Sequence, residues 1–355
     1  MKKRLIMLGI LIVVSVVGLV IYLKTEHRQP EREKILGIIC WGDSLTAGTG
    51  GDGTTYPAVL QQLIQDNLIP GALSDSYEVE VLNMGVGGED TNTILGRNGA
   101  IPFVVAENLV IPAKAEPVEI RFQSAAGKAV APLRQGTAGI EWVEMNGVSG
   151  ELNIDQESYT SSEYSYTFTR KDVGDPVEIP AGTPILTSGS VMGTDYLTVI
   201  FMGENGGYDT YEELIAQQRA IIEHQMGNKD RFIVIGLHTG TAKERADLEA
   251  AMKTEYGDKY INLREYMCTE GLKDAGLTPT SEDEEMMEKG MTPASLMISD
   301  QCHFNEYGYK LIGKLIYNRM DELGYFDEMK NTLRIREGNT YDPKDKKAET
   351  GYFIR

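Results

Sequence analysis

The sequence is poor in the residues on which several common protein classes depend. Its 355 residues include only three cysteines and four histidines, with no Cys-x-x-Cys pair and no His-Glu-x-x-His motif. Three cysteines cannot build a disulfide framework, and so few histidines give little support for a zinc enzyme. We therefore expect neither a metal nor a cofactor.

Positive charge is also scarce. Lys and Arg number 34 against 53 Asp and Glu, for a formal net charge of -19. Such a chain repels phosphate backbones, which argues against nucleic acid as a partner, and anionic headgroups suit the folded part equally poorly. Hydrophobic residues make up 41% and charged residues 25%, an ordinary globular composition that excludes collagen, coiled coil and wholesale disorder.

One long apolar run stands at the N-terminus. Residues 5–23 carry no charge, and a run of this length can cross a bilayer core about 30 Å thick as one helix. Lys2, Lys3 and Arg4 precede it, which favours a cytoplasmic N-terminus and an extracytoplasmic remainder. Cleavage as a signal peptide, followed by secretion, is the alternative, although the end of the run is a poor cleavage site. Residues 24–34 are expected to form a short tether.

Beyond the tether, apolar runs alternate with helical patterns. This order predicts a parallel sheet with helices on both faces, an α/β fold. The strands are expected at 35–41, 77–82, 197–202, 232–237 and 260–263, and the helices at 56–67, from 91, at 211–224, 242–256 and 305–323. The acidic run Glu282 to Glu285 is expected to be a solvated surface segment, and the tail after Thr332 to be irregular.

The helical period disappears between about residues 102 and 190. Four segments there have strand character, at 118–122, 140–145, 164–169 and 177–179. Asn146-Gly147 between two strands is a strong hairpin signal. We predict a small all-β domain, 102–190, inserted into an α/β domain made of 35–101 and 191–330, with a tail at 331–355.

Four short motifs follow predicted strands or precede the last helix. At these places the carboxyl ends of parallel strands bring side chains to one ligand-binding edge, where backbone N–H groups favour an anion. The motifs are Gly42-Asp43-Ser44-Leu45, Asn83-Met84-Gly85-Val86-Gly87-Gly88, Gly203-Glu204-Asn205 and Asp300-Gln301-Cys302-His303.

In order and position these motifs resemble the four blocks of the SGNH hydrolases, also called GDSL esterases and lipases. The resemblance spans residues 35–323 and implies a flavodoxin-like three-layer sandwich. It implies that Ser44 is the nucleophile, His303 its base and Asp300 the residue that orients the imidazole. It also implies an oxyanion hole made of the Ser44 and Gly88 N–H groups and the Asn205 side chain.

The sequence departs from the family pattern at two places. Gly206 stands where the third block usually has Asp, which leaves open how the Asn205 loop is held, and Phe304 follows His303 where many members have proline. The inserted β domain lies outside the minimal family fold.

Two further residues, Arg97 and His238, have two possible roles each. Arg97 is either a binder of a substrate carboxylate or phosphate, or an ordinary structural arginine. His238 either lines the cleft or has a structural role. Cys302 is expected to be an inert thiol beside His303. The glycines at 48, 50 and 53 fit a dinucleotide fingerprint, but no acidic residue ends the second strand to bind a ribose, so they are expected to form a mobile loop.

The sequence thus predicts a membrane-anchored, extracytoplasmic serine esterase that needs no cofactor. An anchored enzyme facing outward meets wall polymers and glycans, so O-acetyl or other short acyl esters on carbohydrate are the favoured substrates. A lipase or lysophospholipase-like acyl hydrolase is one alternative, and a catalytically silent glycan-binding module is another. Acyl chain length, the alcohol part of the substrate, the role of the insertion and the oligomeric state are left open.

Overall fold

The computed structural model describes residues 32–134, 136, 138–158 and 161–336. The predicted membrane segment, residues 5–23, lies outside this range. Within the described ranges, no helix combines the length and the apolar character that a bilayer crossing requires.

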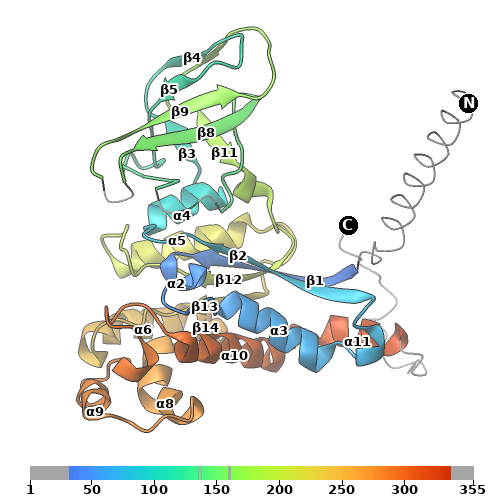
Figure 1. Ribbon diagram of the computed structural model, residues 1–355, viewed down its shortest axis with the longest axis vertical. Helices are drawn as coiled ribbons and strands as arrows, with labels where there is room; N and C mark the ends of the chain where they lie inside the picture. Colours follow the sequence, from blue (N-terminus) through green and yellow to red (C-terminus); the bar gives the residue numbers. More distant parts are fainter. Residues whose placement is uncertain (1–31, 135, 137, 159–160, 337–355) are drawn as a thin grey trace, which may run out of the picture.

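A five-stranded parallel sheet forms the centre of the molecule (Figure 1). The strand order is β14-β13-β12-β1-β2, which is 2-1-3-4-5 when these strands are numbered along the chain, the order of flavodoxin-type doubly wound sheets. The predicted α/β class with a parallel sheet is confirmed. The strands are β1 (Glu33–Gly42), β2 (Tyr77–Gly85), β12 (Leu197–Phe201), β13 (Phe232–Ile235) and β14 (Tyr260–Ile261).

Helices cover both faces of this sheet and bury a separate apolar core on each. β1 is buried from Leu36 to Gly42 because it has neighbours on both edges and helices above and below. One core packs the sheet against α4 (Thr91–Asn98), α5 (Tyr211–His224) and α6 (Ala242–Tyr256). The other packs it against α3 (Tyr56–Leu68), α10 (Glu306–Glu322) and α11 (Asp327–Arg336).

Short helices complete the α/β part. These are α2 (Ser44–Ala47), α7 (Leu263–Tyr266), α8 (Leu272–Asp274), α9 (Ser281–Glu288), the 3-10 turns η1 (Gly71–Leu73), η3 (Gly257–Lys259) and η5 (Ala294–Leu296), and the π-helical turn η4 (Met267–Gly271).

The antiparallel strands all lie between residues 103 and 187, within the range predicted for the insertion. They form a seven-stranded sheet, a separate two-stranded sheet and a core of their own, on the α4 side of the molecule (Figure 1). The strands are β3 (Phe103–Val105), β4 (Leu109–Ile111), β5 (Val118–Ile120), β6 (Phe122–Gln123), β7 (Val143–Met145), β8 (Val148–Gln156), β9 (Tyr164–Arg170), β10 (Val177–Ile179) and β11 (Pro184–Thr187). The 3-10 turn η2 (Ser188–Val191) leads back to the parallel sheet.

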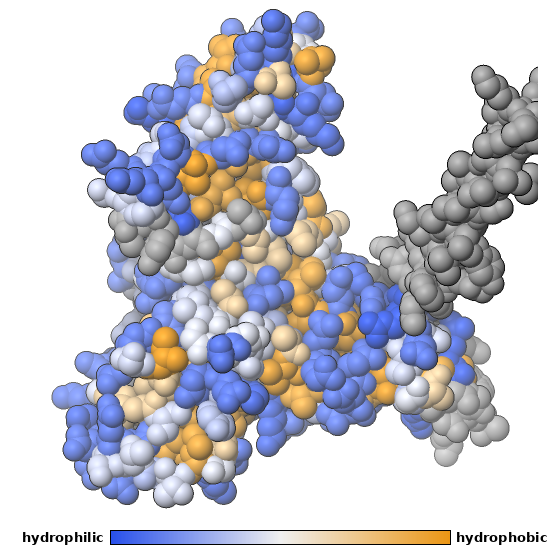
Figure 2. Space-filling model, in the orientation of Figure 1, coloured by the Kyte–Doolittle hydropathy of each residue, from blue (hydrophilic) through white to orange (hydrophobic). Residues whose placement is uncertain are grey.

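The predicted hairpin at Asn146-Gly147 is confirmed. Met145 pairs with Val148, and the two turn residues have φ of 49° and 78°. Positive φ at both central positions is the requirement of a type I′ turn. On the face shown in Figure 2, apolar residues gather at the waist between this domain and the α/β part.

Two sequence expectations hold only in part. The run Glu282 to Glu285 lies in α9, and its three glutamates are exposed as expected, but Asp283 is buried and accepts hydrogen bonds from Thr280 and Ser295. The chain after Thr332 is still helical to the end of α11, where Leu333 is buried.

Candidate active site

The site lies where the strand order of the parallel sheet reverses. β1 lies between β2 and β12, and all three strands run parallel, so the loops after them meet at one edge. Ligands of doubly wound sheets bind at this point, beyond the carboxyl ends of the strands. Asp43 caps α2 by accepting a hydrogen bond from the Leu45 N–H at 2.9 Å, and Ser44 is the first residue of that helix.

A chain of two hydrogen bonds joins Ser44, His303 and Asp300. The Ser44 Oγ lies 2.8 Å from His303 Nε2, and His303 Nδ1 lies 2.7 Å from Asp300 Oδ2. An ionised carboxylate only accepts hydrogen bonds, so Nδ1 carries the proton and Nε2 is free to accept from the serine hydroxyl. The structure therefore brings the three predicted residues together, although 259 positions separate Ser44 from His303.

The loop before α10 holds Asp300 and His303 in register. Asp300 Oδ1 accepts from the backbone N–H groups of Cys302 and His303, both at 2.9 Å. Burial raises the pKa of Asp300, but the hydrogen bonds from the His303 side chain and these N–H groups outweigh it and lower the pKa to about 2. Asp300 is therefore ionised at any pH at which the protein would work.

The loop after β2 presents Gly88 beside the nucleophile loop. Val86 donates to the carbonyl of Gly42, which ties this loop to the end of β1, and Gly88 has a φ of 74° that favours glycine. Within the described part of the chain, the N–H groups of Ser44 and Gly88 donate to no protein acceptor. Both are thus available to a ligand.

The Asn205 loop is held by contacts that do not need an aspartate at position 206. The Asn205 Nδ2 donates to the carbonyl of Glu89 at 3.0 Å, and the Gly206 carbonyl accepts from the Thr91 N–H at 3.1 Å. Asn205 is exposed, and its amide has a second N–H for a ligand. These bonds link the loop after β12 to the loop after β2.

Glu204, which the sequence did not single out, anchors the same loop from the other side. Its carboxylate accepts from the His238 N–H at 2.7 Å and from the Thr239 hydroxyl at 2.6 Å. Burial raises the pKa of Glu204, but the nearby His238 and these bonds lower it by more, so the pKa stays below its ordinary value.

Arg97 is not placed to bind a substrate, which corrects that reading of the sequence. Its side chain is 1% exposed and pairs with the Glu89 carboxylate at 2.7 Å. The guanidinium also donates to the carbonyls of Ala138 and Gly42. A buried guanidinium that already pairs with a carboxylate and two carbonyls is not accessible to an external anion.

His238 does not line the cleft either. It is 1% exposed, and its ring packs on Phe304 with 4.2 Å between ring centroids. Burial lowers the pKa of His238 by more than the neighbouring Glu204 raises it, so the pKa lies below its ordinary value. The residue thus has a packing role, and Phe304 supplies its partner.

Cys302 is a poor nucleophile. Burial, followed by the nearby Glu204 and Asp300, raises the pKa of its thiol to about 11. Because the thiolate is the reactive form, this thiol is inert near neutral pH.

Asp43 is a second residue that sequence reasoning missed. It is 1% exposed, and its Oδ2 has no hydrogen-bond partner among the described residues. Burial raises its pKa most, the Leu45 N–H lowers it by less, and Glu204 and Glu89 add to the rise, to about 7. The sequence held one signal of this burial, since Asp43 directly follows a strand whose last residues are all apolar or glycine.

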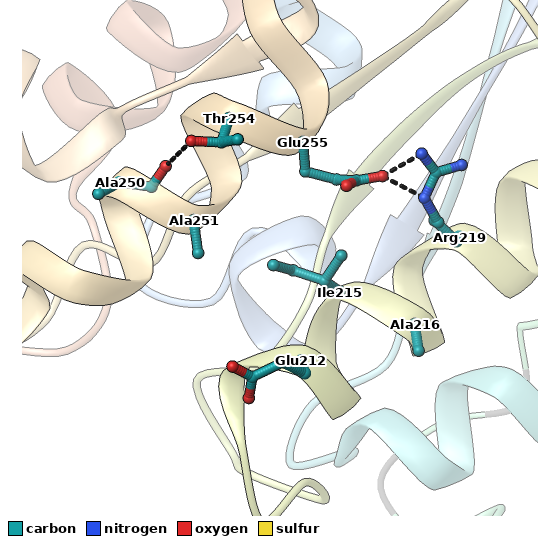
Figure 3. Close-up of a pocket in the computed structure, with 8 residues that line it drawn as sticks. All are labelled: Glu212, Ile215, Ala216, Arg219, Ala250, Ala251, Thr254 and Glu255. Atoms are coloured by element: carbon teal, nitrogen blue, oxygen red, sulfur yellow. Dashed lines mark hydrogen bonds and ion pairs between the residues drawn. The ribbon is translucent and has the colours of Figure 1, made fainter.

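A hollow of about 560 Å³ between α5 and α6 lies elsewhere (Figure 3). Figure 3 shows its wall of Ile215, Ala216 and Ala251, with Arg219 paired to Glu255 at the rim. It offers no nucleophile with an adjacent base. Across the described ranges, no three His, Cys, Asp or Glu side chains are grouped so that they could hold a metal ion.

Comparison with known proteins adds little to this geometry. No protein-family model matches the sequence, and no curated protein matches it. One solved structure that matches is described as a peptidoglycan O-acetylesterase in action. The match covers 85% of this chain and 94% of that chain, with 11% sequence identity and a TM-score of 0.32. A TM-score of 0.32 is too low to establish a common fold, so we base the function of this chain on its own site.

Proposed function

We propose that this protein is a serine ester hydrolase of the SGNH type. The observation that carries the proposal is the pair of hydrogen bonds from Ser44 Oγ to His303 Nε2 and from His303 Nδ1 to Asp300, at 2.8 and 2.7 Å. A nucleophile, a base and an orienting carboxylate within hydrogen-bond reach are the recognisable geometry of covalent acyl transfer. The strand order and the position of Ser44 at the switch point also support it.

The reaction would proceed through an acyl-enzyme. The Ser44 Oγ attacks the ester carbonyl while His303 Nε2 takes its proton, and the ionised Asp300 stabilises the imidazolium. His303 then protonates the leaving alcohol as the carbon–oxygen bond breaks. In the second half, His303 removes a proton from water, which attacks the acyl group and releases the carboxylic acid and free Ser44.

The oxyanion of each tetrahedral intermediate would be bound by the three loops at the sheet edge. The N–H groups of Ser44 and Gly88 donate to no acceptor among the described residues, and Asn205 keeps one N–H of its amide for the oxyanion after the other donates to Glu89. Donors held in place before the reaction lower the barrier because they need no reorganisation.

For the substrate we propose short acyl esters, foremost O-acetyl groups, on carbohydrate. The support is indirect. The uncharged run at residues 5–23 favours a membrane anchor with the catalytic domain outside the cytoplasm, where the enzyme would meet acylated wall polymers and glycans.

The direct test is hydrolysis of 4-nitrophenyl esters from acetyl to dodecanoyl, followed by release of acetate from O-acetylated glycans. Ser44→Ala should lose all activity with an unchanged melting temperature. Ser124→Ala is the matched control, because this buried serine lies in the insertion and accepts from the Lys128 N–H. It should keep full activity.

The outcomes separate the alternatives. Preference for acetyl together with a dead Ser44→Ala variant supports the carbohydrate esterase. Preference for long chains favours a lipid acyl hydrolase with the same mechanism. The proposal of a serine hydrolase is refuted if the parent protein is inactive on every ester, or if Ser44→Ala is as active as the parent.

A further inference from the structure

We propose that Arg97 is a positioning residue that ties the inserted β domain to the oxyanion hole, so that the insertion keeps the catalytic loops in place. This inference rests on the proposed function, since it concerns the same site. It assigns a role to a buried arginine that does not touch substrate.

The Arg97 guanidinium is the centre of a buried polar network. Its Nε and Nη2 donate to the Glu89 carboxylate at 3.0 and 2.7 Å, and its Nη1 donates to the Ala138 carbonyl at 2.9 Å. Its Nη2 also lies 3.4 Å from the Gly42 carbonyl, and the guanidinium lies 5.1 Å from the centre of the Trp41 ring. The planar fork of arginine can meet all these acceptors at once, which a lysine ammonium cannot.

Two of these contacts lead directly to the oxyanion donors. Gly42 is two residues before Ser44, at the end of β1. Glu89 follows Gly88, and the backbone carbonyl of Glu89 accepts from the Asn205 side chain at 3.0 Å. The position of one guanidinium therefore bears on all three proposed donors.

The other contacts lead into the insertion. The Ala138 carbonyl belongs to it, and the Arg97 carbonyl accepts from the Thr187 hydroxyl at the end of β11, at 2.6 Å. A Cβ built on Gly139 would meet the Met84 Cε at 2.9 Å, so this segment lies directly against β2. The insertion is thus packed against the strand that carries the Gly88 loop.

Weakening this network should lower kcat more than it changes KM. A shift of about 1 Å in a catalytic group costs up to roughly 100-fold in rate, whereas substrate contacts outside the oxyanion hole persist. For Arg97→Lys we expect kcat to fall at least about tenfold with KM within about threefold of the parent. In the Arg97→Lys background, adding Asn205→Ala should lower kcat by less than about tenfold further, because the two residues act as a unit.

The matched control is Arg170→Lys. Arg170 is also a buried arginine, but among the described residues it donates only to carbonyls of the insertion, those of Pro112, Asp172 and Asp175. Its loss should lower the melting temperature and leave kcat unchanged.

The experiment measures kcat and KM on 4-nitrophenyl acetate and, separately, the melting temperature. The proteins compared are the full-length parent, Arg97→Lys, Arg170→Lys, Asn205→Ala and the double variant Arg97→Lys/Asn205→Ala. If Arg97→Lys does not fold, the neutral pair Arg97→Met with Glu89→Gln takes its place under the same limits. A kcat within about twofold of the parent, or equal losses in the Arg97 and Arg170 variants, overturns the inference. If the parent is active, Ser44→Ala is inactive and the Arg97 variant is unaffected, only this inference is refuted. An inactive parent refutes the proposed function.

Discussion

Replacing Asp43 by asparagine should stabilise the protein at high pH and have little effect at low pH. The Asp43 carboxyl is 1% exposed, one of its oxygens has no partner among the described residues, and its pKa rises to about 7 from an ordinary 3.8. Asparagine keeps the acceptor for the Leu45 N–H and the shape of the side chain, but it cannot ionise.

The sign follows from the direction of the pKa change. Below the ordinary pKa, Asp43 is neutral in both the folded and the unfolded chain. As the pH rises, the unfolded chain ionises first, so stability falls until the folded carboxyl also ionises near pH 7. At about 1.4 kcal/mol per pKa unit the whole loss is about 4 kcal/mol, of which roughly 2.5 kcal/mol falls between pH 5 and 8.

Urea unfolding at several pH values measures this difference. The free energy of unfolding of Asp43→Asn minus that of the parent should rise by about 2.5 kcal/mol from pH 5 to pH 8, while other titrating groups cancel in the difference. Asp52→Asn, at an exposed carboxyl in the following loop, is the control for the exchange itself, and a rise of the same size there would mean that burial of Asp43 is not the cause. A constant difference for Asp43→Asn as well would refute the reasoning, because it would mean that the carboxyl ionises in the folded protein as it does in water.

Three more substitutions test the site and its scaffold. Asn205→Ala should lower kcat roughly 100- to 1,000-fold at an unchanged melting temperature, and a loss below about fivefold would remove Asn205 from the oxyanion hole. Asp300→Asn should lower kcat roughly 10,000-fold by favouring the wrong imidazole tautomer. Because the pKa of Asp300 is about 2, the parent's rate profile between about pH 5 and 9 should contain no step from this group. Gly85→Ala should destabilise by about 2 kcal/mol or more in urea unfolding, because a Cβ there would lie 2.1 Å from the Ala47 nitrogen. Gly71→Ala, with open space around it, should unfold like the parent.

The sequence alone was enough to predict the order of elements in the α/β part. Strands buried on both faces are continuous apolar runs, and amphipathic helices repeat every three to four residues, so both patterns are local. The runs at 35–41 and 197–202 became β1 and β12, and the stripe at 305–323 became α10. Asn146-Gly147 predicted its hairpin because positive φ at two adjacent positions suits few other residues.

The same local logic located the candidate nucleophile. A parallel sheet brings the ends of its strands to one edge, so residues after β1, β2 and β12 were expected to meet. The distances from Ser44 to His303 and from His303 to Asp300 are properties of the folded chain, because loop closure over 259 positions has no local signature.

Only the tertiary structure decided which charged residues are buried and what they contact. Arg97 in a Gly-Arg-Asn-Gly stretch is compatible with a surface, a binding site or a core, and its burial follows from the insertion packing over it. Asp283 in an acidic run is buried for the same kind of reason, since Thr280 and Ser295 meet it in space. The pKa of Asp43 is likewise raised by burial first and then by Glu204 and Glu89, which come from other loops. Burial and charge pairing depend on contacts between distant segments, and a sequence pattern records only the neighbours along the chain.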